Sequence, residues 1–436
     1  MPILLKWHLG FLLICVLTPT FLAASEKAAG NENVYVQRVM ERDQVSGEYR
    51  PPESQGSLTL RQDTTQPVIA QESTAVSSYD SNPVAVRAVD RNISLFTDRI
   101  RERFSLWLHR SGRYLELMKD ILKAKNIPED IAFLPLIESG FNPNAYSVAR
   151  AVGPWQFIAS TGRKYGLKID WWTDERKDPV KSTEAAANYL KDLYEMFGSW
   201  NLAMAAYNAG EGRILKALNR SKSDDYWALL NTRYIKNETK EYVPRFIAAR
   251  LIATDPQTYG FVDQEYHSPF TYDEVIIDRP VDIEVAAECA ETTAETIREL
   301  NPELRRWSTP PNVSSYALRI PFGKKERFTE NLSRIAEEER FSISVYTVKN
   351  GDTVKRISNK TGIPVNVILE LNDEEKIKPL KAGEKICLPP KDKFSLDRDD
   401  RANASKSLKI KKIRVKKQMS RKIIASVNRK QTYLND

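Results

Sequence analysis

The chain has few of the residues that build metal sites and disulfide frameworks. Its 436 residues include three cysteines and three histidines, and beyond residue 25 only Cys289, Cys387, His109 and His267 remain. Two isolated histidines are too few for a metal cluster, and two cysteines in apolar contexts do not make a disulfide framework. The sequence also lacks a glycine-rich phosphate loop and any Ser-His-Asp set. We therefore expect no cofactor.

Acidic residues are scarce in one stretch, where Glu138 is the only acid between Ile131 and Ile169. A helix is predicted there, starting near Pro128 and ending at Gly140. Apolar residues surround this helix on all sides, so we expect Glu138 to be partly buried. Burial and the negative end of the helix dipole would both raise the pKa of Glu138 toward neutrality, which suits a proton donor. The alternative is a carboxylate that is exposed at a frayed helix end or serves only structure.

The body of the chain lacks net positive charge, which is concentrated at the end of the sequence. Residues 401–436 hold twelve Lys or Arg and one acid, so removing their +11 from the chain's +8 leaves −3 for the other 400 residues. We predict that residues 392–436 are a basic disordered tail. The tail could attract carboxylates of peptides or anionic lipid headgroups, or it could have no partner. Nucleic acid is an unsuitable partner, because the N-terminal segment described next predicts that the chain is exported.

Long apolar runs are absent except near the N-terminus. Lys6 precedes an apolar core from Leu9 to Leu17, and small residues follow at Ala23-Ala24-Ser25. Residues 1–25 are therefore predicted to be a signal peptide that directs the protein to the periplasm. Cys15 lacks the small preceding residue that a lipid-attachment site favours, and the run is short for a membrane span. Lipidation and a retained anchor stay open as alternatives.

The remaining chain divides by composition and periodicity. Residues 26–89 are rich in Ser, Thr, Gln, Glu and Pro and predict a disordered linker. Residues 90–258 have apolar residues every three or four positions, which predicts one mainly helical domain. Its clearest helix follows Asp178-Pro179 and stops at Gly198.

A repeat follows the helical region, at an offset of 71 residues that shortens to 68 at its end. The matching pairs are Val275-Ile276-Ile277 with Tyr346-Thr347-Val348, Leu300-Asn301 with Leu371-Asn372, and Leu318-Arg319-Ile320-Pro321 with Ile386-Cys387-Leu388-Pro389. Two small strand–helix–helix–strand units, residues 270–323 and 344–391, would explain this. The predicted class is thus α+β and multidomain, mainly α first and βααβ units second.

Four clusters in the helical region combine glycine, proline, aromatic and amide residues. They are Ile137-Glu138-Ser139-Gly140-Phe141-Asn142-Pro143, Gly153-Pro154-Trp155-Gln156-Phe157, Ala205-Ala206-Tyr207-Asn208-Ala209-Gly210-Glu211-Gly212 and Glu238-Thr239-Lys240-Glu241-Tyr242-Val243-Pro244. Singly, each has an ordinary explanation as a cap, a core aromatic or a turn. In this order they resemble the soluble-lytic-transglycosylase family over about residues 90–258.

The resemblance implies a lysozyme-like catalytic domain that cleaves the bond between N-acetylmuramic acid and N-acetylglucosamine in peptidoglycan. The product would carry a 1,6-anhydro end, and Glu138 would act first as acid and then as base. The positions that match the family's substrate contacts are Ser139, Ser147, Gln156, Tyr207, Asn208, Glu238 and Tyr242. Pro154 departs from the family, which usually has leucine there, and a stiffer loop could alter which sugar ring fits.

The chemistry of the residues agrees with a mechanism that uses one carboxylate. Ordinary glycosidases need two carboxylates, one to protonate the leaving oxygen and one to attack or activate water. A tethered C6 hydroxyl of the sugar would make the second carboxylate unnecessary. Glu238 could supply a second carboxylate, although we favour a structural or electrostatic role for it. A hydrolytic muramidase on the same fold and a non-catalytic peptidoglycan-binding scaffold are the alternatives.

The second repeat carries a further motif, Val348-Lys349-Asn350-Gly351-Asp352-Thr353. It resembles the LysM module, which in other proteins binds glycans that contain N-acetylglucosamine. The resemblance implies a glycan-binding role for Gly351, Asp352 and Thr353. The first repeat lacks this loop, so its binding ability is doubtful. The expected partners are the glycan strands of peptidoglycan.

Overall fold

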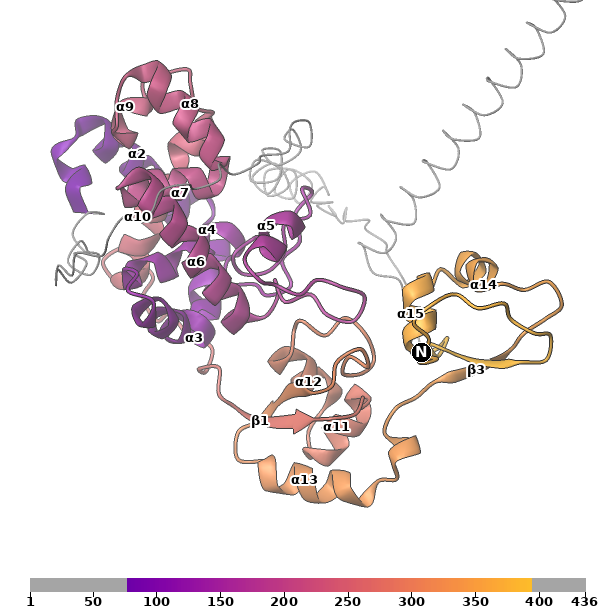
Figure 1. Ribbon diagram of the computed structural model, residues 1–436. Helices are drawn as coiled ribbons and strands as arrows, with labels where there is room; N and C mark the ends of the chain where they lie inside the picture. The colour runs from indigo at the N-terminus through magenta and orange to yellow at the C-terminus, as the bar shows by residue number, and fades with distance from the viewer. Residues whose placement is uncertain (1–76, 394–436) are drawn as a thin grey trace, which may run out of the picture.

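The computed structural model describes residues 77–393 (Figure 1). A helical domain comes first and two small units, each with two strands, follow it (Figure 1). The predicted mainly helical domain followed by βααβ units is therefore confirmed. The predicted signal peptide lies outside the described residues, as do most of the linker and of the basic tail.

The helical domain consists of nine α-helices and three shorter helical turns within the described residues. The helices are α2 (Pro83–Ser94), α3 (Arg101–Ala124), α4 (Leu134–Ser139), α5 (Ala159–Lys164), α6 (Pro179–Phe197), α7 (Trp200–Ala209), α8 (Glu211–Ser221), α9 (Tyr226–Leu229) and α10 (Asn237–Thr254). The turns are η2 (Ser77–Ser81), η3 (Leu95–Arg99) and η4 (Glu129–Phe133). One apolar core joins α2, α3, α4, α6, α7 and α10.

The first helix begins earlier than predicted. Its cap is Asn82, whose side chain accepts hydrogen bonds from the backbone of Val84 and Ala85, and Pro83 occupies its first turn. Proline suits this position because the first helical N–H groups have no partner within the helix. The last residues of the predicted linker, which was expected to run to residue 89, are therefore helical.

The helix that bears Glu138 is divided in two, where the sequence predicted one element. A 3-10 turn, η4, runs from Glu129 to Phe133, and the α-helix α4 begins only at Leu134. Pro135 explains the division, because it has no N–H to donate to the carbonyl of Ile131. Gly140 ends α4 in the left-handed conformation, as predicted.

Helix α6 has the predicted bounds. Asp178 caps it by accepting hydrogen bonds from the backbone N–H groups of Val180 and Lys181, and Gly198 ends it with a φ of 63°. Helix α10 ends at Thr254, and Pro244 lies inside this helix. Pro244 leaves the carbonyl of Lys240 without its helical donor, and the buried Tyr226 hydroxyl donates to that carbonyl at 2.8 Å. This substitute bond keeps α10 continuous between Glu238 and the rest of the helix.

The two small units share one architecture. The first contains β1 (Tyr272–Ile277), α11 (Ile283–Cys289), α12 (Ala294–Leu300) and β2 (Tyr316–Pro321), and the second contains β3 (Ser344–Thr347), α14 (Val354–Thr361), α15 (Val365–Glu370) and β4 (Lys385–Leu388). Each pair of strands is antiparallel. Helix α13 (Lys325–Arg334) and the turn η5 (Glu337–Glu339) connect the units and were not predicted.

The repeat extends to the hydrogen bonds of one asparagine in each unit. Asn301 donates to the carbonyls of Ile297 and Arg319 and accepts from the Arg319 N–H. Asn372 makes the same three bonds with Ile368 and Cys387. In each unit the asparagine ties the second helix to the last strand, which explains why it recurs at the same offset.

The first small unit is docked on the helical domain by buried charges. Arg319 in β2 donates to both carboxylate oxygens of Asp178, at 3.2 and 2.9 Å, and neither side chain reaches solvent appreciably. The Arg306 guanidinium lies 3.6 Å from the ring centre of Trp171. Thr173 and Leu304 form an isolated antiparallel bridge between the two parts. These contacts fix the loop at residues 170–178, which the cleft described below depends on.

We expect Asp178→Ala to lower the free energy of unfolding by roughly 3 kcal/mol or more, because the Arg319 charge would stay buried without its main partner. The variant also loses the cap of α6. Asp225→Ala is the matched control, since Asp225 caps α9 through the Ala228 N–H at 3.1 Å at an exposed site, and it should cost about 1 kcal/mol. Denaturant unfolding of the full chain measures both, and equal losses would contradict a stabilising role for the Asp178–Arg319 pair.

Candidate active site

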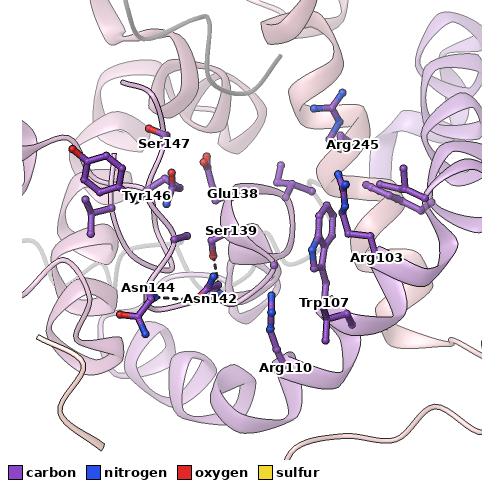
Figure 2. Close-up of a pocket in the computed structure, with 18 of the residues that line it drawn as sticks. Arg103, Trp107, Arg110, Glu138, Ser139, Asn142, Asn144, Tyr146, Ser147 and Arg245 are labelled. Atoms are coloured by element: carbon purple, nitrogen blue, oxygen red, sulfur yellow. Dashed lines mark hydrogen bonds between the residues drawn. The ribbon is translucent and has the colours of Figure 1, made fainter. Parts of the chain in front are cut away.

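A cleft of about 880 Å³ opens on the helical domain beside Glu138. One side is formed by α4 and the loop that follows it, with Ser139, Ser147 and Gln156 among the lining residues. Figure 2 shows Arg103, Trp107 and Arg110 of α3 on the other side of this cleft. The predicted acid therefore lies on the wall of a cavity large enough for a chain of sugars.

Glu138 occupies the last turn of α4, and the residues around it fix its position. Gly140 follows with a φ of 59°, which few residues with a side chain adopt. A Cβ at Gly140 would lie 2.1 Å from Cδ1 of Trp107, so the indole ring packs directly against this turn. Both the backbone conformation and the contact with Trp107 require glycine here.

The carboxyl group of Glu138 opens on the cleft but is closely surrounded. The Tyr242 hydroxyl, from α10, donates a hydrogen bond to Oε1 of Glu138. Burial raises the pKa of Glu138 to about 7, while the Tyr242 hydrogen bond and the charge of Arg245 act in the lowering direction. Near neutral pH a substantial fraction of Glu138 therefore carries the proton that an acid catalyst donates.

The loop of Gln156 is held rigidly against α4. Ser139 donates to the Pro154 carbonyl at 2.9 Å, and the Gln156 side chain donates to the Gly153 carbonyl at 2.9 Å. Gly153 has no room for a side chain, because a Cβ would lie 1.8 Å from the Arg176 carbonyl oxygen. Ser147 accepts a hydrogen bond from the Ala151 N–H at 2.9 Å. The predicted loop residues Ser139, Ser147 and Gln156 thus meet beside Glu138.

A buried ion pair supports this loop from behind. Arg176 is bound to Asp174 at 2.7 Å and also donates to the carbonyls of Arg150 and Phe157, at 2.9 and 3.1 Å. The Asp174 N–H donates to the Glu303 carbonyl of the first small unit. The loop at residues 150–157 is therefore connected through one ion pair to the docked unit.

The other predicted site residues lie behind the wall of the cleft. Tyr207 is half-buried and donates to the Trp155 carbonyl at 2.7 Å, and Asn208 accepts from the Thr239 hydroxyl at 3.1 Å. Asn208 is also hydrogen-bonded to Glu238, whose pKa is raised to about 7 by burial and, to a lesser degree, by the Glu138 charge. Tyr207, Asn208, Glu238 and Tyr242 are not among the lining residues of the cleft. They lie next to Glu138 and its loop on the side away from the cleft.

Two further carboxylates line the cleft, and each is engaged. Asp174 holds Arg176, as described. Glu241 pairs with Arg91 at 2.7 Å and accepts from the Asn92 amide at 2.8 Å. Among the described residues, Glu138 is therefore the one carboxyl on this surface without an ion-pair partner.

Sequence reasoning missed a set of basic residues on the opposite wall. Arg99, Arg103 and Arg110 line the cleft, together with Arg245 of α10 and Arg305 of the first small unit. The sequence did contain a signal for these arginines. Phe96, Phe104 and Leu108 define the buried face of this region, and Arg99, Arg103 and Arg110 lie off that face at spacings of four and seven residues. The contribution of Arg305 had no such signal, since it depends on domain docking.

Comparison with known proteins agrees with this geometry. The chain matches three family models: Transglycosylase SLT domain over residues 117–230, Lytic transglycosylase MltD, LysM-like domain over residues 271–337, and LysM domain over residues 346–389. It is similar to membrane-bound lytic murein transglycosylase D of Escherichia coli (strain K12), with 32% identity over 316 residues, 67% of this chain and 69% of that protein. The chain belongs to the lytic murein transglycosylase family. The resemblance stated from the four clusters is thus confirmed, and the protein is an enzyme of the lyase class.

Two more distant proteins resemble parts of this lytic transglycosylase. Membrane-bound lytic murein transglycosylase C of Haemophilus ducreyi is 25% identical over 166 residues, covering 32% of this chain and 45% of that protein. A solved structure of an inactive mutant of lytic transglycosylase Slt from Pseudomonas aeruginosa is 24% identical, with a TM-score of 0.29 over 37% of this chain and 26% of that one.

The predicted glycan-binding residues of the LysM domain hold their own loop together in this lytic transglycosylase. The Asp352 carboxylate accepts from the Tyr346 hydroxyl at 2.7 Å and from the Lys349 N–H at 3.0 Å, and the Tyr346 bond is the main cause that lowers the pKa of Asp352. Thr353 caps α14, and Gly351 has a φ of 78°. Their role toward glycans stays a prediction.

Other predicted features of this lytic transglycosylase can be placed only in part. Cys289 and Cys387 are free thiols, as expected. Between residues 77 and 393, no group of three His, Cys, Asp or Glu side chains is arranged to hold a metal ion, and the prediction of no cofactor stays a prediction. In the same range, no helix is both long and apolar enough to cross a bilayer.

We expect Tyr242→Phe to raise the pKa of Glu138 above about 7, because the lost hydrogen bond favours the ionised form. Carboxyl-carbon NMR titration of the labelled protein measures this pKa, with the resonance assigned by its loss in Glu138→Gln. Tyr165→Phe is the control, since the Tyr165 hydroxyl donates to Asp192 at 2.8 Å instead. An unchanged or lowered pKa in Tyr242→Phe would show that the hydrogen bond does not set the ionisation of Glu138.

Proposed function

We propose that this enzyme cleaves the β-1,4 bond between N-acetylmuramic acid and N-acetylglucosamine in peptidoglycan and leaves a 1,6-anhydro end. The observation that carries the proposal is Glu138, the one carboxyl on the cleft without an ion-pair partner among the described residues. Its pKa is raised to about 7 by burial. A single carboxyl that exchanges its proton near neutral pH suits a reaction in which one group acts twice.

In the first step Glu138 gives its proton to the leaving O4 of the glycan, and the bond to C1 of the muramic acid breaks. In the second step the ionised Glu138 takes the proton from the C6 hydroxyl of the same sugar, and O6 bonds to C1. No water enters, so no second carboxylate is needed to activate it. Delivery from within the sugar can supply on the order of 7 to 11 kcal/mol of the barrier reduction when the geometry is ideal.

The surrounding residues have positioning roles in this proposal. Tyr242 holds Oε1 of Glu138, which leaves Oε2 for the glycan. Ser139, Ser147 and Gln156 shape the loop that the sugar contacts, and Tyr207 supports this loop through the Trp155 carbonyl. Asn208 of α7 holds the first turn of α10, which contains Glu238, by accepting the hydrogen bond of the Thr239 hydroxyl. Because Glu238 does not line the cleft and is hydrogen-bonded to Asn208, we assign it a structural role and not that of a second catalytic carboxylate.

The LysM domain, with Gly351, Asp352 and Thr353, would anchor the enzyme to N-acetylglucosamine units of the wall. The first LysM-like unit serves as a docked support in this proposal, because Arg319 of its last strand is buried against Asp178. The relatives are named membrane-bound, and we propose a periplasmic enzyme associated with the wall.

We expect Glu138→Gln to abolish the clearing of purified peptidoglycan, since an amide cannot donate the proton, while co-sedimentation with peptidoglycan stays nearly unchanged. Glu184→Gln on the exposed side of α6 is the matched control and should clear normally. A folded-state pKa of about 7 means that ionising Glu138 destabilises the fold as pH rises from about 4.5 through 7. Glu138→Gln should therefore be at least as stable as wild type at pH 8. If Glu138→Gln cleared peptidoglycan as fast as wild type, the catalytic assignment of Glu138 would be wrong.

Product analysis separates the alternatives. Mass spectrometry of the released fragments should show ends lighter by one water than hydrolysed ends. Reducing ends would indicate a hydrolytic muramidase on the same fold. Binding without any released product would indicate a scaffold.

The basic tail is proposed to hold the enzyme on carboxylates of the wall or on anionic lipid. A chain that ends at Lys393 keeps the ion pair of Lys393 with Asp282 at 2.8 Å and removes the tail. We expect it to bind peptidoglycan more weakly than the full chain at low salt and equally at high salt, because screening removes the electrostatic part. If the shortened chain and the full chain sedimented equally at low salt, both with peptidoglycan and with anionic vesicles, this role of the tail would be excluded.

A further inference from the structure

The wall of the cleft opposite Glu138 is strongly basic. Three arginines line this wall: Arg99 from the turn η3, and Arg103 and Arg110 from the first half of α3. Arg103 and Arg110 are seven residues apart, which places them about 10 Å apart along one face of the helix. Figure 2 shows both arginines and Trp107 on this wall, with Arg245 above them and Glu138 and Ser147 across the cleft.

Neither Arg103 nor Arg110 forms an ion pair among residues 77–393, although both are only partly exposed. Neighbouring arginines are paired: Arg91 with Glu241 at 2.7 Å and Arg113 with Glu299 at 3.4 Å. The two arginines of the wall thus have neither a carboxylate partner nor full solvation. Unpaired charges held together inside a concave surface raise its positive potential and attract anionic ligands.

The sugar rings of the proposed substrate do not explain this charge, because their hydroxyl and acetamido groups are neutral. Carboxylates occur only on the lactyl arm of the muramic acid, either as the free lactyl group or in the peptide attached to it. Arginine suits such groups because its planar guanidinium binds a carboxylate through two parallel hydrogen bonds.

We propose that Arg103 and Arg110 bind carboxylates on the lactyl arm of the glycan strand, and so favour strands that carry these groups. The inference rests on the proposed function for the position of the glycan in the cleft. With Glu138 on one wall and the arginines on the other, a strand in the cleft presents its rings to Glu138 and its lactyl arms to α3. These residues select and position the substrate and take no part in the proton transfer.

The first test measures binding in the full-length Glu138→Gln protein, so that no ligand is consumed. The probes are soluble strands with intact peptides, strands stripped of peptides by an amidase, and chitin oligosaccharides, which have no carboxylate. Adding Arg103→Gln and Arg110→Gln together should weaken binding of carboxylate-bearing strands about tenfold at low salt and leave chitin oligosaccharide binding unchanged. Lys123→Gln, which removes a charge from α3 outside the cleft, is the matched control and should change neither.

The pattern of losses identifies the source of the carboxylate. A loss confined to peptide-bearing strands assigns the site to the peptide, and equal losses on peptide-bearing and stripped strands assign it to the lactyl group. Unchanged binding of both strands would overturn the proposal, and so would an equal loss on chitin oligosaccharides, which would indicate a damaged cleft. Cleavage products of the enzyme with Glu138 intact test the proposed function separately, so failure of one does not decide the other.

Discussion

The site depends on the partial removal of one carboxyl group from water. Glu138 stands at the end of a short helix whose other faces are packed into the core, and the resulting desolvation raises its pKa to about 7. Tyr242 limits this rise by donating to Oε1, so the carboxyl stays able to ionise as well as to hold a proton. The close packing of Trp107 on Gly140 keeps this turn in place. A looser turn would let water reach the carboxyl group and return its pKa toward that of a free glutamate.

The support of this carboxyl extends beyond the helical domain. Asp174 and Arg176 hold the loop at residues 150–157, and the backbone of Asp174 is bound to Glu303 of the first small unit. That unit is in turn fixed through Arg319 and Asp178, where Asp178 also caps α6. Buried charges of this kind are costly unless every partner is in place, which makes the docking geometrically specific. The first LysM-like unit is therefore part of the structure that shapes the cleft.

The two small units share one architecture and differ in the residues that they add to it. Both retain the asparagine that joins the second helix to the last strand, Asn301 in one and Asn372 in the other. Only the second has the Gly351-Asp352-Thr353 loop, and only the first has a buried arginine in its last strand, Arg319. Arg305 of the first unit also lines the cleft. The second unit meets the helical domain too, since the Trp172 indole donates to Glu370 at 2.9 Å.

The sequence by itself determined the elements whose signals are local: the caps of α6 at Asp178 and Gly198, the stop at Gly140, the repeat, and the candidate acid Glu138 in an apolar run. Only the tertiary structure decided the start of α2, the division between η4 and α4, and the continuity of α10 across Pro244, which depends on Tyr226. It also decided that Tyr207, Asn208, Glu238 and Tyr242 lie behind the cleft, while Arg103, Arg110 and Arg305 line it. The reason is that caps and periodicity act over a few neighbouring residues, whereas desolvation and charge pairing depend on residues that are distant in the chain and meet only on folding.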